Sequence, residues 1–335
     1  MLLSLSHQTI LISSSPATAL TRDSKMLLFL AALLGLYLLF RWHRERQRVP
    51  NLLDKYVLIT GCDSGFGNKL ARQLDEQGLR VLAACLTQKG AEQLKEATSQ
   101  RLQTVILDVT SKMSVAAMAQ WVKEQVGDRG LWGLVNNAGI CIPLAPNEWL
   151  SVDDFMQVIN VNLIGMIDVT LNLLPHVRRA CGRIINMSSV AGRLALSGGG
   201  YCISKFGVEA FSDSLRRDLS SFGVKVSVIE PGAFKTEIGN PEVLRKSLEK
   251  IWSRVPSEVK ESYGEGSYQN FYNGMGAITT KITSNLSVVT DCMEHGLTAV
   301  YPRTRYAAGW DAKLFYVPLS YFPTILADTI IAKLK

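Results

Sequence analysis

The chain has 335 residues, of which 47% are hydrophobic and 19% charged, and its formal net charge at pH 7 is +7. This composition excludes an intrinsically disordered chain and is sufficient for a sizeable buried core. No basic repeat, arginine-rich arm or nucleic-acid-binding motif accompanies the positive charge, so nucleic acid is not an expected partner. The six cysteines have no CxxC spacing and no histidine cluster, so we expect neither a metal site nor a disulfide framework.

The first predicted element is the apolar run at residues 26–42, which is uncharged from Leu27 to Phe40. It is somewhat shorter than the ~20 residues of a spanning helix, although tilt and snorkelling arginines can close part of that gap. A cleaved signal peptide would need small residues at a cleavage site and a buried soluble helix would show a polar face, and the run has neither. We therefore predict an uncleaved membrane anchor. Because Met26 could itself start a chain, we hypothesise that residues 1–25 are an upstream extension.

A basic linker is predicted at residues 43–54, where Arg44, Arg46 and Arg48 follow the anchor. By the positive-inside rule these arginines predict that the rest of the chain faces the cytosol, although Arg22 and Lys25 on the other side weaken that prediction. The sequon that begins at Asn285 offers a test, because a glycan there would place the domain in the lumen.

A glycine-rich turn follows the short apolar strand predicted at residues 55–60, and a helical pattern follows the turn. Glycines let a backbone approach a pyrophosphate, and the N–H groups and positive end of the next helix then bind it. The spacing differs from the G-x-G-x-x-G dinucleotide fingerprint, so the flanking strand and helix carry the prediction. The expected cofactor-binding residues in this turn are Gly61, Cys62, Asp63, Ser64, Gly65, Phe66 and Gly67.

Strand and helix patterns then alternate along the chain. This order predicts an α/β fold with a doubly wound parallel Rossmann sheet, whose ligands bind at the carboxyl ends of the strands. The strands are expected at residues 80–84, 104–107, 133–135, 183–187 and 225–229, and the helices at 89–97, 115–126, 155–174 and 201–219.

Three of these strand ends carry candidate cofactor residues. Asp108 is placed to meet an adenine, although a turn or helix-cap role fits it equally. The run from Asn136 through Ala138 to Gly139 allows close approach of a cofactor, and an asparagine-rich turn would also explain it. At the last strand the candidates are Pro231, Gly232 and Thr236.

The choice between NAD and NADP depends on residues near the adenosine ribose. The second strand ends at residues 83–87 without the acid that usually holds this ribose. No Arg or Lys lies in the glycine turn to hold a 2′-phosphate, and Asp63 would repel one. We therefore predict NAD as the cofactor, with NADP as the alternative.

Candidate catalytic residues lie between the fifth strand and the helix that follows it. Tyr201 and Lys205 are four residues apart, so on a helix they share one face, and a nearby ammonium lowers the pKa of a phenol. Ser189, at the end of the preceding strand, could polarise a substrate oxygen while Tyr201 moves its proton. Asn162, inside an apolar helical pattern, is either a helix-bending residue or part of a hydrogen-bond relay.

Together these motifs resemble the short-chain dehydrogenase/reductase superfamily in order and spacing over about residues 53–320. The runs Ile-Thr-Gly-Cys-Asp-Ser-Gly-Phe-Gly, Gly-Leu-Trp-Gly-Leu-Val-Asn-Asn-Ala-Gly and Val-Glu-Ala-Phe-Ser-Asp-Ser-Leu-Arg-Arg look like the microsomal retinol dehydrogenase and 3α/17β-hydroxysteroid dehydrogenase group, which prefers NAD.

The resemblance implies a role for each catalytic candidate. Tyr201 would be the general acid/base, Lys205 would lower its pKa and bind nicotinamide ribose, Ser189 would hold the substrate oxygen, and Asn162 would position a water in a proton relay. Ser188 also lies at a distance from the tyrosine that occurs in the superfamily. Ser189 matches the second serine of the family's Asn-x-Ser-Ser pattern, and Asn162 rather than Asn160 precedes its Leu-x-Gly.

The resulting domain plan is a single oxidoreductase domain at residues 55–312 with an inserted helical substrate lid at 237–286. The lid is rich in aromatic residues, which suits a long apolar ligand, although an ordinary helical cap would also fit. Residues 313–335 form an apolar segment that we interpret as surface packing or a membrane-interface contact.

The expected function is hydride transfer between NAD and the alcohol of a lipophilic substrate such as retinol, with hydroxysteroid activity, at the endoplasmic reticulum membrane. The sequence leaves the direction of reaction open, and a homodimer is one of the assemblies considered. A steroid-only dehydrogenase and a non-catalytic NAD-bound membrane scaffold remain alternatives, although a scaffold has no need of Ser189, Tyr201 and Lys205.

Overall fold

The computed structural model describes residues 22–236, 240–279 and 283–333, so most of the predicted extension at 1–25 lies outside the described residues. The chain divides into two units, Met1–Gln47 and Arg48–Lys335, which we name the anchor unit and the catalytic unit after the roles that the sequence predicts for them. The helices are α1 (Arg22–Arg46), α2 (Gly65–Glu76), α3 (Gln88–Glu96), α4 (Lys112–Val126), α5 (Val152–Ile159), α6 (Met166–Arg179), α7 (Gly200–Asp218), α8 (Pro241–Arg254), α9 (Ser257–Tyr263), α10 (Ser267–Thr279), α11 (Ser287–Thr298), α12 (Val317–Leu319) and α13 (Thr324–Ala332). The strands are β1 (Tyr56–Thr60), β2 (Arg80–Cys85), β3 (Gln103–Ile106), β4 (Gly133–Asn136), β5 (Arg183–Met187), β6 (Lys225–Pro231) and β7 (Arg305–Ala308).

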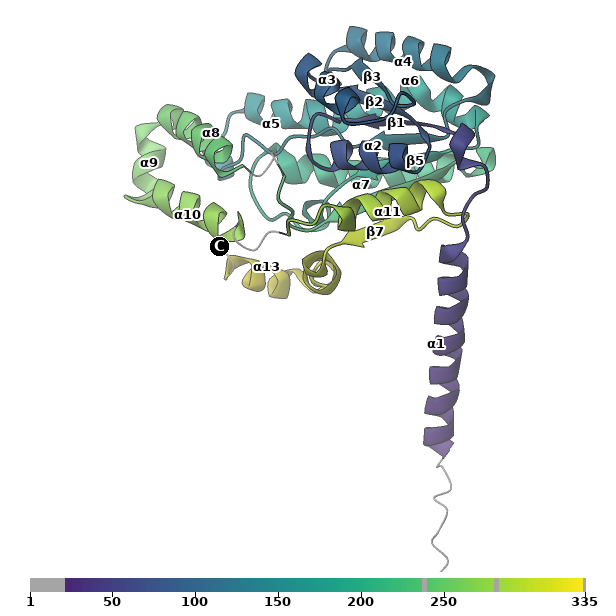
Figure 1. The fold of residues 1–335 in the computed structure, drawn as a ribbon. Coiled ribbons are helices and arrows are strands. Elements are labelled where there is room, and N and C mark those ends of the chain that lie inside the picture. Colours follow the sequence, from purple (N-terminus) through teal and green to yellow (C-terminus); the bar gives the residue numbers. More distant parts are fainter. Residues whose placement is uncertain (1–21, 237–239, 280–282, 334–335) are drawn as a thin grey trace, which may run out of the picture. The chain divides into compact units, whose positions relative to one another are not determined.

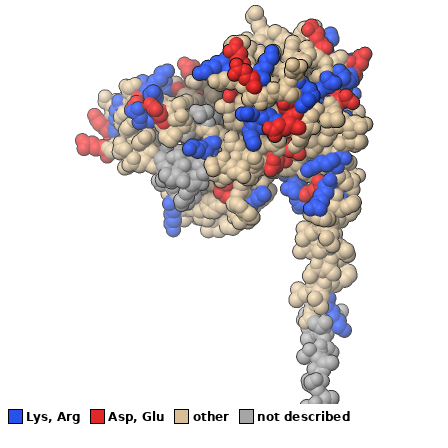
Figure 2. Space-filling view, viewed as in Figure 1, with Lys and Arg blue, Asp and Glu red and all other residues tan. Residues whose placement is uncertain are grey.

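The described residues of the anchor unit form one helix, α1, which is tan along most of its length in Figure 2. A stretch of 23 residues, Ser24–Arg46, is long and apolar enough to cross a membrane, and none of its apolar window is buried. The helix therefore exceeds the predicted run of 26–42 at both ends, which removes the shortfall in length. It also continues to Arg46 and so includes the first part of the predicted linker.

The catalytic unit is built on one seven-stranded sheet with the order β3-β2-β1-β4-β5-β6-β7. Every neighbouring pair is parallel, and the order reverses between β1 and β4, as the predicted doubly wound sheet requires. The six predicted strands lie within two residues of the observed ones at each end. The seventh, β7, was not predicted, because its four residues Arg-Tyr-Ala-Ala carry no run of β-branched side chains.

Helices cover both faces of the sheet (Figure 1). Alternating strand residues divide between the two cores: Val57 and Ile59 of β1 pack with α2, α3 and α11, while Leu58 packs with α4, α6 and α7. Strands buried on both faces in this way are typical of parallel sheets. The helix pair α5 and α6 is also long and apolar enough to cross a membrane, but Val169 and Leu173 lie in the core, so we interpret it as a core helix.

Two leucines of α6 provide a matched test of this core. We expect Leu173→Ala to lower the free energy of unfolding by ~2–5 kcal/mol, because Leu173 is fully buried and its loss leaves a cavity. Leu171→Ala on the same helix should change it by less than ~0.5 kcal/mol, since Leu171 is exposed. Denaturant titration of both variants measures the difference, and equal effects would contradict the assigned faces of α6.

Candidate active site

A cavity of about 670 Å³ lies at the carboxyl edge of the sheet, where strands β1 to β6 end. The change of strand order between β1 and β4 opens a crevice at this edge in doubly wound sheets. Most of the predicted site residues line the cavity: Gly61, Asp63, Ser64, Gly65, Phe66, Asp108, Ala138, Gly139, Ser189, Tyr201, Lys205, Pro231, Gly232 and Thr236. Four predicted residues are not among its lining residues: Cys62, Gly67, Asn136 and Asn162.

The glycine turn needs its glycines for two different reasons. Gly61 and Gly65 have φ values of 71° and 62°, which residues other than glycine rarely adopt. A Cβ on Gly61 would also come within 2.8 Å of the Cα of Ala138. The backbone of the turn therefore runs close to the end of β4, and α2 begins at Gly65 with its N-terminus at the cavity. This is the arrangement that binds a pyrophosphate.

The two asparagines after β4 have different roles. Asn136 is buried inside the sheet, where its amide donates to the side-chain oxygens of Asn186 and Thr170, at 2.8 Å each. It supports the site from within the sheet instead of lining the cavity. Asn137 does line it, and its amide donates to the backbone oxygens of Thr60 (2.9 Å) and Gly61 (3.1 Å). The sequence prediction missed Asn137, which holds the glycine turn against β4.

Asp63 reaches from the glycine turn to the end of β2. Its carboxylate accepts hydrogen bonds from the backbone N–H groups of Leu86 (2.8 Å) and Thr87 (2.9 Å) and from the Thr87 hydroxyl (2.7 Å). The acid that the end of β2 lacks is thus supplied from the neighbouring turn. Neither Leu86 nor Thr87 was a predicted site residue, although both line the cavity.

Asp108 lines the cavity, and its carboxylate forms the hydrogen bonds of a turn. It accepts from the backbone N–H of Thr110 at 2.9 Å and from the Thr110 hydroxyl at 2.7 Å. The N-cap of α4 is Ser111 instead. Both interpretations of Asp108, as a turn residue and as a cavity residue, therefore agree with its position.

Ser189 and Tyr201 meet on the wall of the cavity. Burial raises the pKa of the Tyr201 phenol well above its ordinary value, and a hydrogen bond from the Ser189 hydroxyl lowers it in part. The Ser189 hydroxyl also accepts from the backbone N–H of Ala191 at 3.1 Å. Ser188 instead hydrogen-bonds to the backbone oxygen of Lys205 at 3.4 Å. Of the two serines, it is Ser189 that contacts the tyrosine.

Lys205 is buried beneath the tyrosine on the same helix. Its ammonium donates to the backbone oxygen of Met187 at 2.8 Å and lies 5.7 Å from the centre of the Tyr201 ring. Burial lowers the pKa of Lys205 to about 8. Burial therefore dominates the pKa values of both residues.

Asn162 lies in a π-helical segment, Asn160–Gly165, between α5 and α6. Its side-chain oxygen accepts from the backbone N–H of Ile140 at 2.8 Å. Its amide donates to the backbone oxygen of Ile140 (2.8 Å) and to the hydroxyl of Ser204 (3.0 Å). These contacts hold the loop after β4 against α7, and Ser204 in turn bonds to the backbone oxygen of Tyr201 at 2.7 Å.

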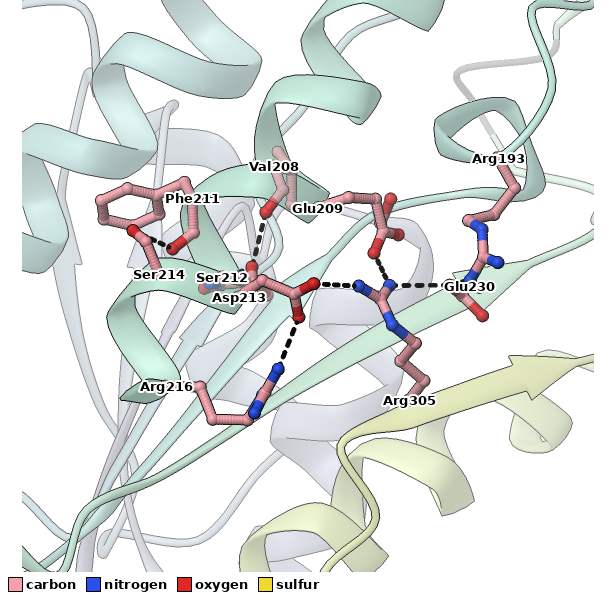
Figure 3. A network of polar contacts seen from close by, with 12 residues as sticks. Arg193, Val208, Glu209, Phe211, Ser212, Asp213, Ser214, Arg216, Glu230 and Arg305 are labelled. Carbon is pink, nitrogen blue, oxygen red and sulfur yellow. Dashed lines mark hydrogen bonds and ion pairs between the residues drawn. The ribbon is translucent and has the colours of Figure 1, made fainter. Parts of the chain in front are cut away.

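Behind the cavity, arginines and acids form a chain of ion pairs (Figure 3). Glu230 pairs with Arg193 at 3.1 Å and with Arg305 at 3.0 Å, and burial raises the pKa of Glu230 while Arg193 opposes the shift. Arg305 also pairs with Glu209 and Asp213 of α7. The chain thereby joins β7 to three cavity elements: the loop after Ser189, helix α7 and the end of β6.

The aromatic side chains of the predicted lid do not line the cavity in the described part of the chain. Trp252, Tyr263 and Phe271 instead pack around Trp149, with ring centres 4.6, 5.3 and 5.8 Å away. These contacts agree with an ordinary helical cap, and contact of the lid with an apolar ligand stays a prediction. Residues 237–239 and 280–282 and the Met275 side chain lie outside the described residues.

Two cavity residues come from parts of the chain that the sequence analysis did not connect with the site. Cys141 follows β4, and burial raises the pKa of its thiol to about 11. Tyr316 belongs to the predicted C-terminal apolar segment and also lines the cavity. Neither residue stands in a motif, so no sequence signal pointed to them.

Comparison with known proteins identifies the relatives of this chain. The family model described as short chain dehydrogenase matches residues 55–246. Retinol dehydrogenase 16 of Homo sapiens is 64% identical over 305 residues, which cover 91% of this chain and 96% of that protein. Retinol dehydrogenase 7 of Mus musculus is 63% identical over 306 residues, with the same shares. The 17-beta-hydroxysteroid dehydrogenase type 6 of Homo sapiens is 60% identical over 308 residues, 92% of this chain and 97% of that protein.

Solved structures share the fold at low sequence identity. A short-chain dehydrogenase from Streptomyces avermitilis has a TM-score of 0.65 and 24% identity, covering 84% of this chain and 95% of that chain. A short chain dehydrogenase/reductase from Burkholderia phymatum in complex with NAD has a TM-score of 0.63 and 23% identity, covering 79% and 92%.

The lowered pKa of Lys205 predicts a pH-dependent stability difference. Between about 8, the pKa in the folded protein, and its ordinary value of 10.5, the unfolded chain binds more protons at this residue, so folding becomes more favourable as pH rises. The unfolding free energy of the wild type minus that of Lys205→Met should therefore increase from pH 7 to pH 10. Denaturant titrations at several pH values measure it, with the exposed Lys246→Met as control. A flat difference would contradict the burial of a charged Lys205.

Proposed function

Because the chain belongs to the short-chain dehydrogenase/reductase family, we propose that it transfers a hydride between NAD and the alcohol carbon of a lipophilic substrate. The names of its relatives support retinol and retinal as substrates, with activity on hydroxysteroids and ketosteroids. One observation carries the proposal: Ser189, Tyr201 and Lys205 line the same cavity as the glycine turn.

The residues present fit a dinucleotide cofactor. The turn from Gly61 to Gly65 and the N-terminus of α2 would hold its pyrophosphate, and Lys205 would bind the ribose next to the nicotinamide. Asp63 and Thr87 would meet the adenosine ribose. When bound, the cofactor supplies a hydride acceptor or donor.

Tyr201 is the proposed acid/base. Its protonated state in the free site suits donation of a proton to a carbonyl oxygen, which is the reducing direction. In the oxidising direction, the phenolate accepts the proton of the substrate hydroxyl, and a charged Lys205 nearby favours that phenolate. Ser189 donates a hydrogen bond to the substrate oxygen while the charge on that oxygen changes. Asn162 supports this proton path by fixing Ile140 and Ser204, and a water held beside it would complete a relay.

We further propose that α1 anchors the protein in the endoplasmic reticulum membrane with the catalytic unit in the cytosol. The basic residues His43, Arg44 and Arg46 in its last turn support this orientation. Asn285 is exposed in the catalytic unit, so its sequon is accessible, and a glycan on it in cells would contradict the cytosolic location. The second sequon, at Asn186, is fully buried.

Substitution of the tyrosine tests the function. With NAD and a panel of retinols, 3α-hydroxysteroids and 17β-hydroxysteroids, the wild type should form NADH, measured by its absorbance. Tyr201→Phe should lower turnover at least ~100-fold, because general acid–base catalysis is lost, while NAD binding, measured by fluorescence titration, stays nearly unchanged. Absence of turnover with every alcohol would favour the scaffold alternative, and turnover with steroids alone would favour a steroid-only dehydrogenase. A variant that keeps more than about a tenth of the wild-type rate would rule out Tyr201 as the acid/base.

The choice of NAD is tested at Asp63. A carboxylate at the end of β2 repels a 2′-phosphate, and the neutral Asp63→Asn side chain keeps one oxygen that can still accept the hydrogen bonds from Thr87. We expect the ratio of kcat/KM for NADP over NAD to rise ~10-fold, equivalent to ~1.4 kcal/mol of repulsion removed. Asp128→Asn, at an exposed position, is the control. An unchanged ratio would contradict the role of Asp63 in cofactor choice.

A further inference from the structure

Exposed apolar side chains are concentrated in residues 310–326, which we call the C-terminal patch. In this patch seven large apolar residues are exposed: Trp310, Leu314, Phe315, Tyr321, Phe322, Ile325 and Leu326. Elsewhere in the described catalytic unit, no helix or strand carries more than two such residues. A cluster of exposed apolar side chains of this kind marks a site of contact with another protein or with a membrane.

The inner side of the same segment is fixed to the active site. Tyr316 lines the cavity, and Asp311 accepts from the backbone N–H of Ala233 at 2.8 Å, in the turn after β6. The Arg193 guanidinium lies over the Tyr321 ring at 5.1 Å and hydrogen-bonds to its side chain. The C-terminal patch is therefore the outer surface of a segment that also forms part of the cavity wall.

The chain itself indicates what covers this surface. The catalytic unit begins at Arg48, two residues after α1 ends at Arg46. The backbone N–H of Val49 donates to the Thr298 oxygen at 2.8 Å, so only Gln47 and Arg48 lie between the end of α1 and this fixed residue. A bilayer that holds α1 must therefore lie close to the catalytic unit. Trp310 and Tyr321 are the residue types enriched where proteins meet a membrane interface, and the exposed Lys313 beside Trp310 adds a positive charge.

We propose that the C-terminal patch docks on the surface of a phospholipid bilayer and that lipid-dissolved substrate reaches the cavity past Tyr316 on this side. The proposal rests on the membrane anchoring and lipophilic substrate of the proposed function. The docked segment lies in the interface and does not span it, because Pro318 and Pro323 interrupt it.

Photocrosslinking tests the docking without relying on turnover. The full-length protein is reconstituted in phosphatidylcholine vesicles that contain a phosphatidylcholine with a diazirine on its acyl chain, and crosslinked peptides are identified by mass spectrometry. We expect lipid adducts on α1 and on residues 310–326. Adducts on α1 alone would overturn the docking and leave the anchor intact. No adducts on either would overturn both, and protein–protein adducts of the patch in place of lipid would assign it to a second copy of the chain.

A matched pair of variants completes the test. Leu314→Glu combined with Ile325→Glu should lower lipid adducts on the patch at least ~10-fold, the factor that corresponds to ~1.4 kcal/mol of lost apolar burial. It should also raise KM for vesicle-borne retinol while leaving kcat/KM for a short water-soluble alcohol unchanged. Both residues are exposed, so folding should persist, and thermal unfolding checks this. Met113→Glu, at an exposed residue of α4, is the control. Equal adducts in both variants would overturn the proposal.

Discussion

Parallel strand pairing, with the reversal of order between β1 and β4, is the constraint on which this site depends. Because all six pairs are parallel, the carboxyl ends of β1 to β6 meet at one edge, and residues distant in sequence line one cavity. Buried polar contacts hold that edge together: Asn136 joins β4 to β5 through Asn186, and Asn137 joins β4 to the turn after β1. The ion pairs around Glu230 and Arg305 then connect β6 and β7 to α7.

Burial and hydrogen bonding act in opposite directions on the pKa of the proposed acid/base, Tyr201. Burial raises the pKa of Tyr201 and lowers that of Lys205, so each residue disfavours its charged form in the free protein. The Met187 oxygen, 2.8 Å away, holds the ammonium in place, and the Ser189 hydroxyl is the group that favours the phenolate. Oxidation needs that phenolate, whereas reduction needs the phenol. The rates of oxidation and reduction should therefore depend on pH in opposite ways.

The sequence predicted the strands of the sheet closely, because each is encoded locally by an apolar run. The glycine turn and Ser189, Tyr201 and Lys205 line one cavity, as a glycine spacing and a helical spacing of four suggested, while their roles stay predictions. The differences between expectation and structure have physical reasons. Whether Asn136 or Asn137 lines the cavity depends on where strand pairing ends. A shift of one residue moves a side chain to the opposite face of the sheet. Aromatic residues of α8 to α10 pack against Trp149, which lies about a hundred residues earlier in the chain. Tyr316 lines the cavity although it belongs to the C-terminal segment. Such long-range contacts leave no pattern in a single sequence. The roles assigned to individual site residues and the domain limits stay predictions.

Hydride transfer between a lipophilic alcohol and NAD is the function proposed for this cavity. The most direct measurement uses retinol with deuterium on the carbinol carbon, incubated with NAD and the full-length protein in vesicles, followed by mass spectrometry of the cofactor. The account predicts that the NADH formed carries the deuterium and that the Tyr201→Phe variant forms almost none. NADH without deuterium, or equal transfer by the variant, would contradict it.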